Sequence, residues 1–184
     1  MIRISKGLDL PISGAPKASL SDEPVSSSVA LLSNDFVGMK PTMFVKEGDE
    51  VKAGQKIFED KKNPGVFFTS PAGGLIKSIN RGEKRRFISI EIEVADQENQ
   101  EEILNDNNEI LLRNLSKFGV INYFRTRPFN KTPKVNDVPD DIFVNICDTN
   151  PLSVDPYIYL QPEIDLFNKA LIKLKEIFNC IIHF

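Results

Sequence analysis

VKEGDEVKAGQKIF, residues 45–58, contains two glycine turns, Gly48-Asp49 and Gly54-Gln55, which lie on either side of Val51. Glycine adopts backbone angles that other residues resist, so each pair predicts a tight turn. Short apolar runs typical of β-strands surround this stretch and are separated by further turn residues. They are Val29–Leu32, Met43–Val45, Lys56–Glu59, Val66–Thr69, Leu75–Ile79 and Phe87–Val94. The pattern predicts a compact all-β unit over residues 1–95.

The same stretch resembles the hammerhead repeat of biotinyl and lipoyl carrier domains. A second match is SPAGGLI, residues 70–76, which resembles the strand that follows the carrier lysine in those folds. Together the two stretches predict a barrel-sandwich hybrid. Carrier chemistry is disfavoured, because Lys61 and Lys62 lie in a longer turn that contains Pro64 and has no flanking methionines. We therefore expect that this chain binds no cofactor covalently.

Composition excludes several function classes. The chain has 184 residues, 41% of them hydrophobic and 27% charged, and a net charge of −3. These values are typical of a globular protein of one or two domains, without the overall positive charge of a nucleic-acid-binding protein. One histidine, His183, and two cysteines, Cys147 and Cys180, leave almost no material for a metal site or a catalytic triad. We expect both cysteines to be buried free thiols.

The rest of the chain predicts a change from β to α/β structure. Residues 96–140 begin acidic, with an apolar helical stripe from Ile103 to Phe118 that Gly119 ends, and continue as a loop. Residues 141–184 predict a strand at Ile142–Cys147, a helix at Pro162–Phe178 and a second strand from Cys180, which together open a βαβ unit. We expect this Rossmann-like α/β domain to be incomplete, in a chain shortened within its second domain. The alternative is that the helix packs on the β unit.

Two segments carry candidate binding residues. Phe124–Phe129, FRTRPF, brackets Arg125 and Arg127 with aromatic rings, and arginine binds carboxylates or phosphates and stacks on rings. The alternative is a loop pinned on the core, whose arginines pair with local acids. Asp148 and Asn150 follow a predicted strand, where ligands gather in open α/β sheets, or they form a turn.

A cluster of basic residues within ten positions could face nucleic acid or anionic lipid. The cluster comprises Lys77, Arg81, Lys84, Arg85 and Arg86. An acidic stretch follows it, so we favour an internally balanced surface.

Several separated stretches resemble the NqrA family, one of the subunits of the sodium-translocating NADH:quinone reductase, in family order. They are Lys6–Gly14, Val37–Met43, Phe58–Val66, Phe68–Pro71, Ile79–Gly82, Phe124–Phe129, Ile142–Val144 and Asp148–Leu152. Family members are more than twice as long, which agrees with a shortened chain. The alternatives are a free-standing lipoyl- or biotinyl-like adaptor module, or the RnfC-type component of the related Rnf electron-transport complex. The Rnf component would need cysteine motifs for iron–sulfur clusters.

The resemblance implies a peripheral, non-redox subunit on the cytoplasmic face of a bacterial inner membrane, attached to the membrane only through its partners. The complex couples NADH oxidation and ubiquinone reduction to sodium export. Its FAD, FMN, riboflavin and iron–sulfur centres are expected in partner subunits, and this chain is expected to contribute to assembly and quinone association. The candidate contacts for quinone, or for the membrane subunit that holds the quinone site, are Arg125, Arg127, Phe129, Asp148 and Asn150. No catalytic residue, metal ligand or nucleic-acid partner is expected.

Overall fold

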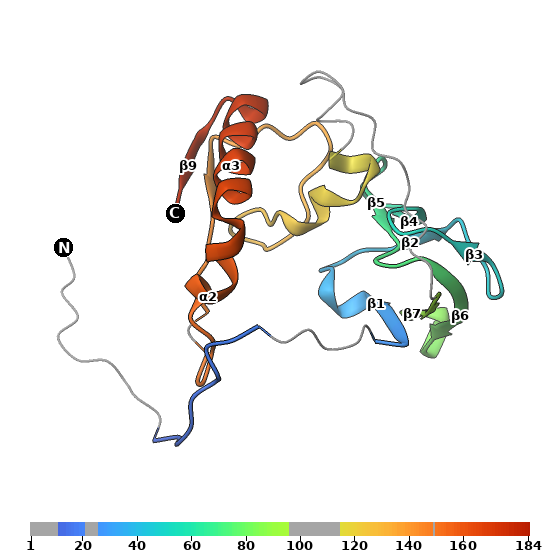
Figure 1. The fold of residues 1–184 in the computed structure, drawn as a ribbon. Helices are drawn as coiled ribbons and strands as arrows, with labels where there is room; N and C mark the ends of the chain where they lie inside the picture. The colour runs from blue at the N-terminus through green and yellow to red at the C-terminus, as the bar shows by residue number, and fades with distance from the viewer. Residues whose placement is uncertain (1–10, 21–25, 96–114, 149) are drawn as a thin grey trace. The chain divides into compact units, whose positions relative to one another are not determined.

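The computed structural model describes residues 11–20, 26–95, 115–148 and 150–184. These residues form two compact units (Figure 1). One unit comprises Pro24–Val138 and contains two antiparallel sheets. The other comprises Pro139–Phe184 together with the described part of Met1–Glu23, and it contains the helices α2 (Pro156–Leu160) and α3 (Ile164–Phe178).

The larger sheet has four strands in the order β1-β7-β6-β3. These strands are β1 (Ser28–Leu32), β7 (Phe87–Val94), β6 (Gly74–Arg81) and β3 (Glu50–Val51). Ile76 pairs with Ile92 and Ile79 with Ile90, so the apolar members of the predicted alternation meet on neighbouring strands. Such cross-strand pairs on one face are what fixes the register of a sheet.

The smaller sheet has three strands in the order β2-β4-β5. They are β2 (Pro41–Met43), β4 (Lys56–Asp60) and β5 (Phe67–Thr69). Phe58 of β4 stacks on Phe68 of β5 with ring centroids 4.6 Å apart, and it meets Phe87 of the larger sheet edge-on at 5.4 Å. The core therefore lies between the two sheets, and the predicted barrel-sandwich hybrid is confirmed.

The two glycine turns of residues 45–58 are built in the same way. Gly48 and Gly54 have φ values of +87° and +82°, which disfavour residues with a side chain. One residue after each glycine, a side-chain oxygen accepts a hydrogen bond from a lysine N–H three residues back. Asp49 Oδ2 accepts a hydrogen bond from the backbone N–H of Lys46 at 2.9 Å, and Gln55 Oε1 accepts one from the backbone N–H of Lys52 at 2.9 Å.

Both turns are also tied to the second matching stretch. Gly48 N–H donates to the Ile76 carbonyl at 2.9 Å, and Gly54 N–H donates to the Ser70 carbonyl at 2.8 Å. The two halves of the sequence signature, residues 45–58 and 70–76, thus meet in space through backbone hydrogen bonds.

Residues 116–122 cover the outer edge of β5. Ser116 Oγ donates to the Gly65 carbonyl, and Asn122 Nδ2 donates to the Phe67 carbonyl at 2.6 Å. Gly119, at φ +74°, precedes the 3-10 helix η3 (Val120–Tyr123). The predicted stop at this glycine agrees with its left-handed conformation. Helical residues 115–117 are described, whereas the rest of the predicted helical stripe from Ile103 lies outside the described residues.

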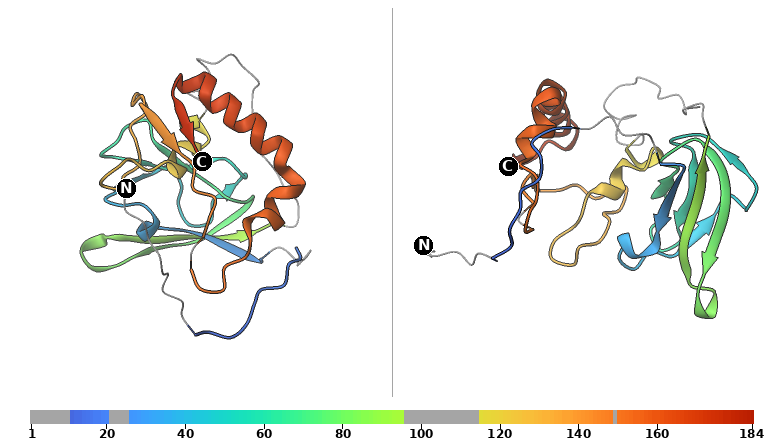
Figure 2. Two further views of the ribbon diagram at one scale, coloured as in Figure 1. Left: turned by 90° about the vertical axis from the view of Figure 1, so that its left-hand side faces the viewer. Right: turned by 60° about the horizontal axis from the view of Figure 1, so that its bottom comes forward.

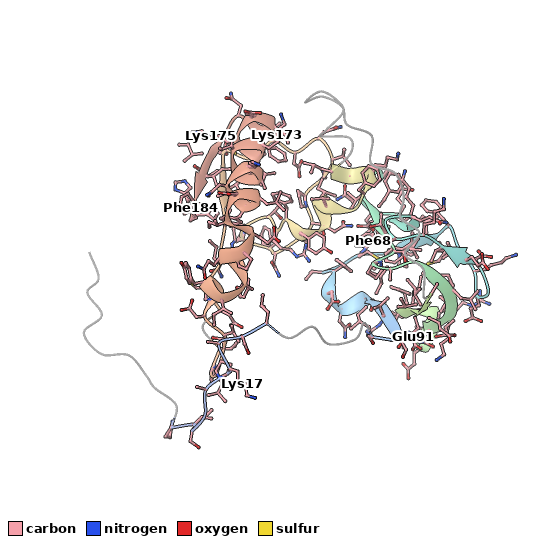
Figure 3. The ribbon with its side chains drawn as sticks, viewed as in Figure 1. Lys17, Phe68, Glu91, Lys173, Lys175 and Phe184 are labelled. Atoms are coloured by element: carbon pink, nitrogen blue, oxygen red, sulfur yellow. The ribbon has the colours of Figure 1, made fainter. Side chains whose placement is uncertain are left out.

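The other unit is a βαβ arrangement. β8 (Asp141–Phe143) and β9 (Ile181–His183) are parallel, and α2 (Pro156–Leu160), η4 (Gln161–Glu163) and α3 (Ile164–Phe178) lie between them in the chain. The predicted α/β character is confirmed. Lys173 and Lys175 are both exposed on α3 (Figure 3).

Two expectations for this unit are wrong. β8 covers only the first part of the predicted strand Ile142–Cys147, because its partner β9 offers three residues for pairing and the last backbone bond runs from Val144 N–H to the His183 carbonyl. Cys147 therefore lies beyond the strand and is exposed, whereas Cys180 is buried as expected. The sequence prediction also missed α2, whose N-cap is Asp155, accepting from Tyr157 N–H at 2.9 Å.

Candidate functional site

Arg125 is held inside its own unit by backbone carbonyls. Its Nη1 donates to the carbonyls of Asn122 and of Phe124, the latter at 2.9 Å, and its Nη2 donates to the carbonyl of Asp35 at 3.1 Å. Its guanidinium carbon lies 5.8 Å from the centre of the Phe36 ring. The structure thus favours the pinned-loop interpretation for Arg125, with carbonyl groups in place of the expected acids.

Arg127 and Phe129 lie on a short loop that faces solvent, residues 126–131, called the 126–131 loop below. The loop is closed at its base, where Thr126 N–H donates to the Lys131 carbonyl at 2.8 Å and Asn130 N–H donates to the Thr126 carbonyl at 2.8 Å. The Phe129 side chain is 72% exposed, so the alternative of a loop pinned on the core does not hold for this residue.

The 126–131 loop carries free binding groups. Among the described residues, no hydrogen bond or ion pair engages the exposed Arg127 guanidinium. Lys131 Nζ lies 5.8 Å from the Phe129 ring centre. Tyr123, 88% exposed just before this segment, is a further aromatic group that the sequence reasoning missed. Exposed arginine and aromatic side chains, such as Arg127 and Phe129 on the loop and Tyr123 just before it, are typical anchors at protein interfaces.

Asp148 and Asn150 form a turn in the other unit. Asp148 Oδ1 accepts from both the backbone N–H of Asn150 at 2.9 Å and its Nδ2 at 2.6 Å. Ser153 Oγ donates to the Asp148 carbonyl at 2.7 Å. Both residues are exposed and five or more residues past the end of β8. The turn interpretation therefore accounts for their side chains, and the five predicted residues are divided between the two units.

The turn between β4 and β5 holds the two lysines considered for carrier chemistry. Lys62 Nζ donates to the Gly38 carbonyl at 2.8 Å, and Asn63 Nδ2 donates to the Pro133 carbonyl at 3.0 Å. Gly65 N–H donates to Glu59 Oε1 at 2.6 Å. A carrier lysine must swing between sites, whereas this turn is tied to two other loops. Of its two lysines, only Lys61 has an exposed side chain without a contact among the described residues.

In the described part of the chain, no three His, Cys, Asp or Glu side chains gather closely enough to hold a metal ion. None of the helices in residues 11–20, 26–95, 115–148 and 150–184 has the length and apolar character needed to cross a bilayer.

Comparisons with known proteins match both halves of the chain. The family described as the NqrA N-terminal barrel-sandwich hybrid domain matches residues 2–95, and that described as the NqrA second alpha/beta domain matches residues 106–184. The A subunits of the Na(+)-translocating NADH-quinone reductase from Yersinia pestis and from Neisseria meningitidis serogroup B are each 45% identical over 190 residues. Both alignments cover 100% of this chain and 42% of the relative. The chain thus spans less than half the length of these curated relatives.

Proposed function

This chain belongs to the NqrA family, and from that membership we propose that it works as part of a peripheral, non-redox subunit of a sodium-translocating NADH:ubiquinone oxidoreductase. The observation that carries the proposal is the 45% identity that extends over 100% of the chain rather than over one motif. Its role is to contribute to the assembly of the complex and to quinone association, while the complex couples NADH oxidation to sodium export.

The 126–131 loop is the proposed contact surface. Its hydrogen-bonded base fixes the loop before binding, which lowers the entropy cost of forming a complex. Arg127 supplies N–H donors that suit a carboxylate or a quinone carbonyl, and Phe129 supplies a ring that can stack on an aromatic partner. Arg125 acts as a positioning residue, because its contacts with carbonyl groups hold the start of this segment.

Asp148 and Asn150 are the proposed contacts of the α/β unit. Each exposes polar atoms beside its turn, and this position follows a strand of a parallel sheet. We propose that these residues and the 126–131 loop contact the membrane subunit that holds the quinone site, on the cytoplasmic face of the membrane.

Redox cofactors are assigned to other subunits. An iron–sulfur centre commonly takes four cysteine ligands, and this chain has two cysteines in all. We propose that FAD, FMN, riboflavin and iron–sulfur centres are held by partner subunits, and that ubiquinone reaches this chain only as the substrate of the complex.

Co-purification tests the proposal. A tagged chain is produced with the other subunits of the complex and recovered from detergent-solubilised membranes. We expect the chain to retain the other subunits, and the double variant Arg127→Gln, Phe129→Ala to retain at least tenfold less. The matched control is Lys134→Gln, Val138→Ala, which removes one cation and one exposed apolar side chain from the same unit.

The outcomes separate the two levels of the proposal. Recovery of the unchanged chain without any other subunit would overturn the assigned role. Equal retention by the double variant and its control would leave the role intact but remove the 126–131 loop from the interface. Equilibrium dialysis with a short-chain ubiquinone then tests direct quinone contact, which we expect only in the presence of the membrane subunit.

A further inference from the structure

The turn between β6 and β7 gathers an unusual density of positive charge. Gly82 N–H donates to the Arg86 carbonyl at 2.8 Å and closes the turn around the short 3-10 segment η2 (Glu83–Arg85). Four cations lie at this position, Arg81, Lys84, Arg85 and Arg86, and all are exposed. These residues together with Glu83 are called the basic tip below. Figure 2 (right) shows the β6–β7 hairpin extending past the other strands of its unit.

No described residue neutralises the cations of the basic tip. In the part of the chain that the structure describes, none of its four cationic side chains has a hydrogen bond, ion pair or ring contact. Glu91 of β7, which is labelled in Figure 3, already accepts a hydrogen bond at its Oε1 from Asn80 Nδ2 at 2.9 Å. The acidic residues from Asp96 to Glu109, which were expected to balance these cations, lie outside the described residues.

Backbone strain at the basic tip points to a role for its side chains. Lys84 and Arg85 have φ values of +52° and +60°, a left-handed conformation that favours Gly, Asn or Asp in hairpin turns. Two consecutive residues with long side chains in this conformation lower the free energy of unfolding, whereas Asn-Gly at the same positions would not. Residues in such strained conformations are commonly found at functional positions.

The distribution of charge indicates the charge and the shape of the partner that the basic tip would bind. Four cations and Glu83 give the basic tip a charge of +3, while the whole chain carries −3, so the remainder carries −6. The basic tip is therefore a local centre of positive charge in a chain that is acidic overall, and an anionic surface attracts it. Because the cations project from the end of a hairpin, they suit a flat array of phosphates better than an enclosed ligand. Ile88, 43% exposed, adds an apolar group beside Gly82.

We propose that the basic tip binds the headgroups of an anionic phospholipid bilayer. Three of its four cations are arginines, whose guanidinium groups bind phosphate oxygens through paired hydrogen bonds. This contact is independent of the proposed respiratory role, and it adds a direct membrane contact to attachment through partner subunits. A cation near an anionic membrane strengthens binding by roughly fivefold, so the tip makes a weak, orienting attachment.

Vesicle co-sedimentation of the full chain tests the proposal. The probes are vesicles of phosphatidylcholine with about one third of the anionic lipid phosphatidylglycerol, and vesicles of phosphatidylcholine alone. We expect binding to the anionic vesicles only, weakened at least tenfold by Arg81→Gln, Lys84→Gln, Arg85→Gln, Arg86→Gln, and lost at about 0.5 M salt. The control variant Lys40→Gln, Lys46→Gln, Lys52→Gln, Lys61→Gln removes the same charge from other positions of the unit and should change affinity less than twofold.

Each other outcome overturns the proposal. No binding of the unchanged chain to anionic vesicles, or equal weakening in the two quadruple variants, removes the basic tip as a lipid-binding element. Retention of duplex DNA that depends on the tip, without vesicle binding, would assign the surface to nucleic acid instead. Matching circular dichroism spectra and melting temperatures of the three proteins verify that the variants are folded.

Discussion

Gly38 and Gly119 have nearly the same backbone angle but different surroundings. Their φ values are +75° and +74°. A side-chain carbon added at Gly38 would meet nothing within 4 Å, whereas one added at Gly119 would lie 2.8 Å from Thr69 Oγ1 and 3.3 Å from the Phe67 carbonyl oxygen. The pair therefore separates the cost of a left-handed conformation from the cost of crowding.

We expect Gly38→Ala to lower the free energy of unfolding by about 1–2 kcal/mol, the usual cost of this conformation for a residue with a side chain. Gly119→Ala should lose a further 1–3 kcal/mol or so, because its methyl group pushes residues 116–122 away from β5. Urea unfolding followed by circular dichroism measures both values. Equal losses would show that the contact between Gly119 and Thr69 is looser than described.

Cys147 and Cys180 differ in their expected reactivity. Burial raises the pKa of the Cys180 thiol, and the negative charge of Asp141 raises it further, so little thiolate forms at neutral pH. We expect exposed Cys147 to react with a disulfide reagent at pH 8 at least tenfold faster than Cys180, measured in Cys180→Ser and Cys147→Ser respectively. Because folding raises the pKa of the Cys180 thiol, this group should contribute less to the free energy of unfolding as the pH rises above the ordinary pKa of a thiol. Similar rates in the two variants at pH 8 would contradict the buried position of Cys180.

At the scale of elements, residues 116–122 act as a cover for the edge of β5, which otherwise presents unpaired backbone groups. Asn122 is buried, and its Nδ2 donates to the Phe67 carbonyl, while its Oδ1 has no hydrogen-bond partner among the described residues. The side chain therefore contributes through its donor alone.

This asymmetry predicts an order for two substitutions. Asn122→Ala should cost roughly 1 kcal/mol of stability, because it loses one hydrogen bond but also removes the unpaired oxygen. Asn122→Asp, nearly the same shape, should cost about 3 kcal/mol or more, because it places a buried carboxylate against the Phe67 carbonyl. Ser26→Ala, which removes an exposed serine that bonds to the Ser28 carbonyl, should change stability by less than about 0.5 kcal/mol. Thermal unfolding of the three variants checks the order, and a milder effect of Asp than of Ala would contradict it.

The elements that sequence reasoning located best are those fixed by local chemistry. The turns at Gly48 and Gly54 depend on side chains within three residues, so their pattern is visible in the sequence. The end of β8 depends on how many residues β9 offers for pairing, which is a distant property. The α2 cap at Asp155-Pro156 is local and could have been recognised.

The candidate site follows the same division. The arginines and aromatics of residues 124–129 are evident as binding groups, but their roles depend on contacts with distant residues. Arg125 is engaged by the Asp35 carbonyl, ninety positions away in the sequence, while Phe129 faces solvent because the base of its loop closes between Thr126 and Lys131. Neither result follows from the spacing of the residues.

At the scale of the whole molecule, the two units differ in how much apolar surface they bury. The largest fully buried side chains, Phe58, Ile57, Ile76, Ile90, Ile92 and Val66, all belong to the sheet unit. In the α/β unit, Ile142 and Cys180 are the buried apolar residues among those described, and α3 buries none. A helix on a two-stranded sheet has little core with which to offset its conformational entropy.

Hydrogen exchange should therefore separate the units. We expect backbone amides of β4, β6 and β7 to exchange at least tenfold more slowly than those of α3 and β9 at neutral pH and 25 °C, because protection follows the free energy of local opening. Mass spectrometry of peptic fragments measures this directly. Equal protection across the chain would show that the α/β unit is stabilised to the same extent as the sheets.

The left-handed pair Lys84-Arg85 should respond differently to selection for thermal stability and to selection for membrane binding. A library selected only for tolerance to heat should replace the pair with Asn-Gly, since that exchange relieves the turn at no cost to the core. A library selected for retention on anionic membranes should keep both cations and accept the lower melting temperature. The two selections should therefore favour different residues at the same two positions of this turn.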